Sequence, residues 1–144
     1  MEGISSLMPQ LSKALVELRE QFDDCYPERD RSSDGWIGDT RHSVRKSDHN
    51  PDNKGWVRAL DVDADLRAGK DEMHQVVEQI RLLGRKRLSY IIFDGKIASP
   101  KSLWKWVAYK GVNPHRTHAH FSAKKNQDEN RDFWNVPLLG GSNG

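Results

Sequence analysis

Two histidines one residue apart, His118 and His120, have the types and spacing to do chemistry. If the stretch Thr117–Ser122 is extended, its side chains alternate between two faces of a sheet, so both imidazoles point the same way. Such a pair can ligate a metal ion or transfer protons near neutral pH. The pair alone leaves a structural role equally open, so its partners must come from elsewhere in the chain.

Two further groups can complete a metal site with His120. His49 lies in a polar loop, and Asp61 lies between two apolar residues. A carboxylate in such a run is costly to bury unless it is paired, solvated or bound to a cation. Two imidazoles and one carboxylate are good zinc donors, and a catalytic zinc keeps a fourth position for water, whose pKa it lowers to about 7. His118 would then lie near enough to serve as general acid or base.

Two segments have apolar residues at helical spacing. The first predicts a helix over about 7–23, with Pro9 in its first turn. The second predicts a helix over Met73–Leu83, capped by Asp71 and closed by Gly84.

Strand-like segments surround the candidate residues. Residues 26–56 between the helices are rich in Asp, Asn, Gly, Ser and Arg, which indicates a loop with at most a short strand at Trp36-Ile37, and a loop this long is usually functional. The predicted strands are Val57–Asp63, Leu88–Phe93, Lys96–Ser99 after an Asp94-Gly95 hairpin turn, Trp104–Tyr109 and the stretch with the two histidines. This order predicts an α+β fold with a small, mainly antiparallel sheet flanked by helices.

Length and composition limit the function classes. A chain of 144 residues suits a single domain over 1–144, with a flexible tail at about 140–144. A net charge of +2 argues against a nucleic-acid binder, and no apolar run is long enough for membrane insertion. Cys25 is the only cysteine, which excludes an internal disulfide and a cysteine-built zinc site. The first residues lack a secretory signal, so we expect synthesis in a cytoplasm, as a monomer.

The motifs around these residues resemble those of a known family, the zinc D-Ala-D-Ala carboxypeptidases and endopeptidases of the hedgehog/D-Ala-D-Ala-peptidase superfamily. Ser47-Asp48-His49, Gly55 and Ala59-Leu60-Asp61 are similar to the S-x-H…G-x-A-x-D signature, and His118-Ala119-His120 is similar to the closing H-x-H. Phage endolysins of the family share longer patterns with residues 10–125, namely Ser33-Asp34-Gly35, Gly38-Asp39, His42, Ser47–Pro51, Tyr90–Phe93, Ile97–Ser99 and Asn113–His115.

The resemblance implies His49, Asp61 and His120 as zinc ligands and His118 as the catalytic histidine. Two departures stand out. The step from residue 49 to residue 61 is longer than the usual seven positions, which leaves Asp63 as an alternative ligand. Thr117 stands where many relatives have an acidic residue, three positions before the last histidine.

Substrate binding is assigned to the polar loop. Arg45, four residues before the first ligand, is the candidate for binding a substrate carboxylate, together with Ser47 of the motif. Arg41 and Arg31 remain open as alternatives for the same role.

The resemblance implies a zinc-dependent peptidoglycan hydrolase, an endolysin endopeptidase acting at L-alanyl-D-glutamate in the peptide stem. Such an enzyme accumulates in the host cytoplasm and reaches the cell wall when the membrane is breached. A D-Ala-D-Ala carboxypeptidase is the nearest alternative. A non-catalytic, zinc-stabilised module that binds the cell wall is the alternative of another class.

Overall fold

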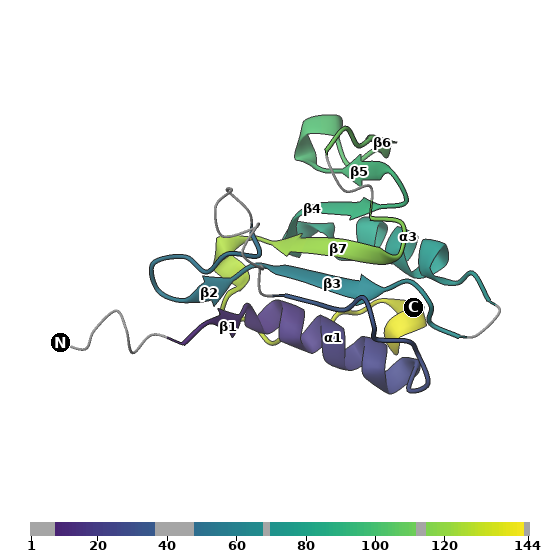
Figure 1. The fold of residues 1–144 in the computed structure, drawn as a ribbon, viewed down its shortest axis with the longest axis horizontal. Helices are drawn as coiled ribbons and strands as arrows, with labels where there is room; N and C mark the ends of the chain where they lie inside the picture. The colour runs from purple at the N-terminus through teal and green to yellow at the C-terminus, as the bar shows by residue number, and fades with distance from the viewer. Residues whose placement is uncertain (1–7, 37–47, 68–69, 112–114, 143–144) are drawn as a thin grey trace.

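The computed structural model describes residues 8–36, 48–67, 70–111 and 115–142. In these ranges it has an α+β fold, with two α-helices and a five-stranded antiparallel sheet (Figure 1). In sheet order the strands are β3 (Ala59–Asp63), β7 (His118–Ala123), β4 (Leu88–Phe93), β5 (Lys96–Ala98) and β6 (Val107–Ala108). The helices are α1 (Lys13–Cys25) and α3 (Met73–Leu83), and the short strands β1 (Gln10–Leu11) and β2 (Trp56–Val57) form a parallel pair. Short 3-10 turns are Arg85–Arg87, Pro100–Ser102, Lys125–Gln127 and Pro137–Leu139.

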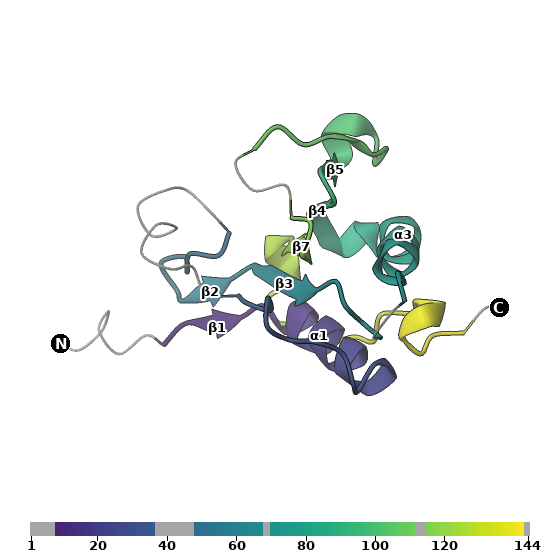
Figure 2. The same cartoon turned by 45° about the vertical axis from the view of Figure 1, so that its right-hand side comes forward.

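The register of the sheet separates a polar face from an apolar one. Directly opposite residues of an antiparallel pair share a face. Asp61 lies opposite His120, whereas Leu60 lies opposite Phe121. Helices α1 and α3 both lie on the side of Leu60 and Phe121 (Figure 2), where their apolar residues join one core. The other face of β3 and β7 is therefore left to loops and polar side chains.

The core holds strand β7 firmly in place. Phe121 is fully buried and packs against Phe22 of α1, with ring centroids 6.1 Å apart. Burying a side chain of this size stabilises the fold by about 1.5–3 kcal/mol. The C-terminal segment closes the core, because the Gln21 amide donates to the carbonyls of Trp134 and Leu139 at 2.9 and 2.8 Å. His118 and His120 thus project from a strand whose opposite face is fixed by packing against the core.

The first helix begins later than the sequence predicts. It starts at Lys13 rather than near residue 7, and the prediction that Pro9 lies in its first turn is wrong. The N–H groups of Gln10 and Ser12 donate instead to the carbonyls of Gly55 and Val57, both at 2.8 Å. This pairing with β2 satisfies backbone groups that a helix start would leave open.

Helix α3 spans Met73–Leu83 as predicted, and Gly84 is its C-cap. The predicted cap Asp71 is wrong, because Glu72 is the N-cap and the Asp71 carboxylate pairs with His74 instead.

The predicted strand over Trp104–Tyr109 is shorter in the structure, covering only Val107–Ala108. Leu103 and Trp104 have φ of 55° and 63°, a left-handed conformation that cannot continue a strand. The Asp94-Gly95 hairpin turn is confirmed, with φ of 51° and 78° at its two residues.

The loop after α1 runs along the free edge of β3. The short strand predicted at Trp36-Ile37 does not include Trp36, and Ile37 lies outside the described residues. A single bridge forms instead at Gly35, which exchanges hydrogen bonds with Asp61 at 3.1 and 2.7 Å. Arg29 holds this loop in place through a bidentate ion pair with Asp34, with hydrogen bonds of 3.0 and 2.7 Å. At the other end of the chain, the Gly141 N–H donates to the Val136 carbonyl at 2.9 Å, so the tail predicted to be flexible from residue 140 is anchored there.

No helix among the described residues is long and apolar enough to cross a membrane.

Candidate metal centre

The three predicted ligands meet on the polar face of β3 and β7. The donor atoms of His49, Asp61 and His120 all lie within 4.8 Å of one another. His120 Nδ1 is 3.0 Å from Asp61 Oδ1, and His49 Nε2 is 3.3 Å from Asp61 Oδ2. Both histidines are buried and Asp61 is nearly so. This group can hold a metal ion.

Backbone pairing brings Asp61 and His120 together before any ligand is present. They are register partners in the β3–β7 ladder, where opposite side chains lie about 5 Å apart. Gly35 pairs with the other edge of β3 at the same residue. The backbone N–H and carbonyl of Asp61 both bond to Gly35, while the residues on either side of it lie in the β3–β7 ladder, so its carboxylate has a fixed starting point.

In His49 and His120, the ring nitrogen that does not face Asp61 already has a partner. His49 donates from Nδ1 to the carbonyl of Trp36 at 3.0 Å, which leaves Nε2 for a metal. Nε2 of His120 lies 2.8 Å from the hydroxyl of Ser122, which leaves Nδ1 for a metal. Such outer bonds select the tautomer and the orientation of a ligand ring.

Tyr90 supports the site from β4, and the sequence alone gave it no role. Its ring stacks on His120 at 5.4 Å with an interplanar angle of 9°. Its hydroxyl donates to Asp48 Oδ2 at 3.0 Å, which ties β4 to the residue before the first ligand. The available signal was a tyrosine among the aliphatic residues of a central strand.

A second histidine pair lies beside the first group. The donor atoms of Asp61, His115 and His118 also lie within 4.8 Å of one another. His118 Nε2 is 3.6 Å from Asp61 Oδ2, and its Nδ1 is 3.4 Å from the Thr117 hydroxyl. The His115 ring centroid is 4.8 Å from that of His118 and 5.2 Å from that of His120. His115 was visible in the sequence only as part of the Asn113–His115 motif.

The electrostatics of the cluster suit metal binding. Burial alone would raise the pKa of Asp61. Hydrogen bonds with His120 and His49 have the larger, opposite effect, so the pKa of Asp61 lies well below the ordinary range. Burial lowers the pKa of His49, and its bond to Asp61 outweighs this and raises that pKa. Burial lowers the pKa of His118, which favours a neutral imidazole. The site therefore combines one carboxylate that stays ionised with an imidazole that can accept a proton.

The alternative ligand Asp63 has another role. Its carboxylate accepts hydrogen bonds from the N–H and the hydroxyl of Ser33 at 3.0 and 2.7 Å, and from the N–H of Asp65 at 2.9 Å. It belongs to neither cluster of potential ligands in the described part of the chain. Asp63 therefore anchors the loop that precedes the site.

The unusually long step between the first two ligands forms a closed turn. The Asp52 carboxylate accepts from the N–H groups of Lys54 and Trp56, both at 2.9 Å. Arg58 pairs with both Asp52 and Asp128 at 2.7 Å. The extra residues thus loop away from the site, so that the long spacing does not keep the two ligands apart.

Most of the residues predicted to bind the substrate lie outside the described residues. Arg45, Ser47 and Arg41 lie outside the described residues. The guanidinium of Arg31 pairs with Asp23 of α1 at 3.0 Å. This exposed ion pair is a weak one, so Arg31 stays an alternative to Arg45.

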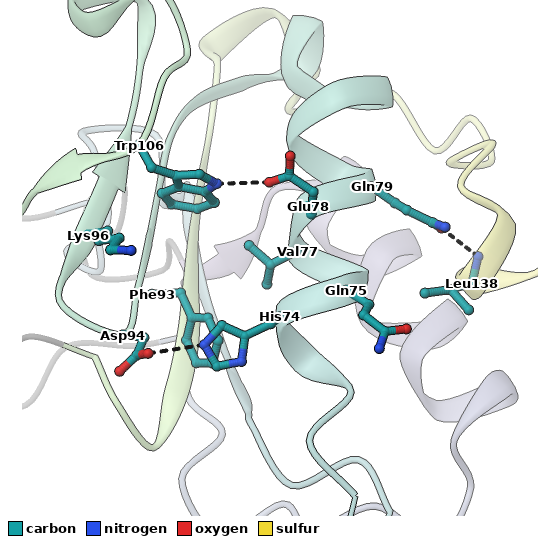
Figure 3. A pocket seen from close by; sticks show the side chains of 10 residues that line it. All are labelled: His74, Gln75, Val77, Glu78, Gln79, Phe93, Asp94, Lys96, Trp106 and Leu138. Atoms are coloured by element: carbon teal, nitrogen blue, oxygen red, sulfur yellow. Dashed lines mark hydrogen bonds and ion pairs between the residues drawn. The ribbon is translucent and has the colours of Figure 1, made fainter.

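A separate groove lies on the helix-covered side of the sheet (Figure 3). It is a cavity of about 690 Å³ between α3 and the β4–β5 hairpin, with Trp106 on the hairpin side. His74 lies in it with its ring 4.7 Å from that of Phe93. The sequence predicts His74 off the apolar stripe of α3, and its side chain is half exposed.

Comparisons of the chain with protein-family models, with curated proteins and with solved structures found no match. The assignment of a function therefore depends on the residues themselves. Two imidazoles and one carboxylate, largely buried and held by outer hydrogen bonds, could hold a metal ion. A further neutral imidazole beside them fits proton transfer.

Proposed function

We propose that this chain is a zinc-dependent peptidoglycan hydrolase that cleaves an amide bond in the peptide stem. The observation that carries the proposal is the buried group of His49, Asp61 and His120 with His118 at its side. The motif resemblance to phage endolysins supports L-alanyl-D-glutamate as the bond cleaved. A metal-binding group alone would fit many proteins, whereas a neutral imidazole within 3.6 Å of the shared carboxylate adds what hydrolysis needs.

Zinc held by the three ligands would polarise the substrate carbonyl and supply an activated water at neutral pH. His118 takes the proton of the attacking water at Nε2, the atom that faces Asp61, and then gives it to the leaving amine. Such proton transfer contributes about 10²–10⁴ in rate. Asp61 offsets the positive charge of the site, and Ser122 holds the His120 ring in register.

The loop before His49 is proposed to orient the substrate. The peptide stem carries carboxylates, and an arginine can bind a carboxylate with two parallel hydrogen bonds. Arg45, with Ser47 near it in sequence, is the proposed anchor.

Digestion of purified peptidoglycan by the zinc-loaded protein tests this function. Mass spectrometry of the soluble products should show new amino termini at the cleaved bond. Release of free D-alanine instead would identify the carboxypeptidase. Wall binding without new termini would identify a non-catalytic module, which is favoured by Thr117, whose hydroxyl replaces an acidic side chain beside His118.

Three variants assign the roles. His120→Ala should lose both zinc and activity, and His118→Ala should keep zinc while its rate falls by about 10²–10⁴. His74→Ala, on the opposite side of the sheet, is the matched control and should keep both. Full activity of the His120→Ala protein would disprove the site assignment.

A further inference from the structure

Asp61 belongs to two clusters of potential ligands at once. Its Oδ1 faces His120 at 3.0 Å, whereas its Oδ2 lies 3.3 Å from His49 and 3.6 Å from His118. The second cluster is completed by His115. A carboxylate with nitrogen donors at both oxygens has the arrangement that bridges two metal ions about 3.5–4 Å apart.

The second cluster contains a buried nitrogen that needs a partner. Nε2 of His118 is buried and makes no hydrogen bond within the described parts of the chain. Leaving such an atom unsatisfied is costly, and an ion or water is the usual explanation. At 3.6 Å, the Asp61 oxygen is too far for a hydrogen bond but suitably placed for both groups to ligate one ion.

The backbone brings His115 to this nitrogen. His115 has a φ of 57°, a left-handed conformation that is rare outside glycine. Its carbonyl accepts from the Asp94 N–H at 2.9 Å, which ties it to the end of β4. Its ring stands edge-on to that of His118, at 87°. The two imidazoles thus meet edge to face instead of stacking.

We propose that His115 and His118, with Asp61 as the bridge, bind a second divalent transition-metal ion, and that this ion inhibits the enzyme. Imidazole donors suit Zn²⁺, Cu²⁺ and Ni²⁺. The binding depends only on these three side chains. The inhibition rests on the proposed function, because His118 cannot ligate an ion and carry a proton at the same nitrogen.

The second ion must bind more weakly than the first. Among the residues that the structure describes, Asp61 is the one carboxylate of both clusters, so that one negative charge would face two dications. Their mutual repulsion at a few ångströms is substantial in a partly buried site. One equivalent of zinc should therefore activate the protein, and excess zinc should inhibit it.

Equilibrium dialysis at increasing free Zn²⁺, with bound metal measured by mass spectrometry, tests the second site. The wild-type protein should bind one ion tightly and a second at higher concentration. His115→Asn should bind only the first, since asparagine tolerates the left-handed backbone but is a poor zinc ligand. Retention of the first ion shows that this variant is folded. His74→Ala is the control and should bind two.

Saturation of the wild-type protein at one ion, two ions in the His115→Asn protein, or loss of both ions from it would each overturn the proposal.

Peptidoglycan hydrolysis gives the second readout. Activity of the wild-type protein should fall by at least about 10²-fold between one and two bound ions, the lower end of what proton transfer contributes. In the His115→Asn protein, activity should not decline over the same zinc range; an equal decline there would overturn the inhibitory role. Two ions in a protein that hydrolyses nothing would refute the proposed function and leave the site standing.

Discussion

His118 and His74 lie on opposite sides of the same sheet, and their surroundings differ in one decisive respect. Both ring nitrogens of His74 have carboxylate partners, Asp71 at 2.9 Å and Asp94 at 3.0 Å. His118 shares the single carboxylate of Asp61 with two other histidines. The first histidine has a carboxylate at each ring nitrogen, whereas the second has a share in one carboxylate.

The groove around His74 and the metal-centre face around His118 differ in the same way. In the groove, the Trp106 indole donates to Glu78 at 2.9 Å, and the Gln79 side chain accepts from the Leu138 N–H at 2.8 Å (Figure 3). Its polar groups therefore satisfy one another and leave mainly apolar surface. On the metal-centre face, three imidazoles face the one carboxylate of Asp61. The two regions thus differ in how many carboxylates are available to each imidazole.

Removing one carboxylate from each region should give the largest difference. Asp61→Asn removes the charge that holds one or both ions, so we expect zinc affinity to fall by more than about 100-fold, beyond the 10–100-fold typical of an outer partner. Peptidoglycan hydrolysis should be lost with it. Competition with a chromophoric chelator measures the affinity.

Asp94→Asn is the matched change in the groove and should leave zinc affinity unaltered. Its effect on the free energy of unfolding should stay below about 1 kcal/mol, because the pair with His74 is exposed. Equal zinc affinities in the two variants would contradict the contrast between the regions.

An outer partner should have a smaller effect than a ligand. Ser122→Ala removes the hydroxyl 2.8 Å from His120 Nε2, so we expect zinc affinity to fall by about 10–100-fold. Ser89→Ala on the neighbouring strand is the control, since the Ser89 hydroxyl lies 3.5 Å from the Ala123 carbonyl. If both variants bind zinc as the wild-type protein does, the Ser122 hydroxyl does not orient the ligand ring.

Patterns confined to one segment predicted the fold well. The alternation around His118 and His120 predicted strand β7, and the 3.6-residue periodicity predicted the body of α3. Errors arose where a distant segment decides the conformation. The start of α1 depends on pairing of Gln10 with β2, which no periodicity in residues 7–23 reveals.

The site shows the same division. His49, Asp61 and His120 could be chosen from residue type and motif spacing, and the structure brings them together. Tyr90 and His115 reach the site through sheet register and a left-handed turn, which only three-dimensional packing determines. These two neighbours were therefore harder to predict than the three candidate ligands.

The smallest expected effect is a pH-dependent contribution of His74 to stability. Burial lowers the pKa of His74, but its bonds to Asp71 and Asp94 outweigh this and raise it above the unfolded value of about 6.5. The bonds therefore add stability that is fully present below about pH 6.5 and is lost as pH rises through the folded pKa. Because the side chain is 51% exposed, solvent screening limits the contribution to about 0.2–1 kcal/mol.

Urea unfolding of metal-free wild-type and His74→Gln protein, between about pH 5.5 and pH 8.5, measures this contribution around the ordinary histidine pKa. The metal-centre histidines are present in both proteins, so their titration cancels in the difference. The wild-type advantage should be largest at the acid end and shrink toward the alkaline end. An advantage that does not change with pH would mean that packing of the ring against Phe93, rather than its charge, stabilises the groove. In that case the two carboxylates would only orient His74, and the contrast with His118 would be one of geometry rather than of charge balance.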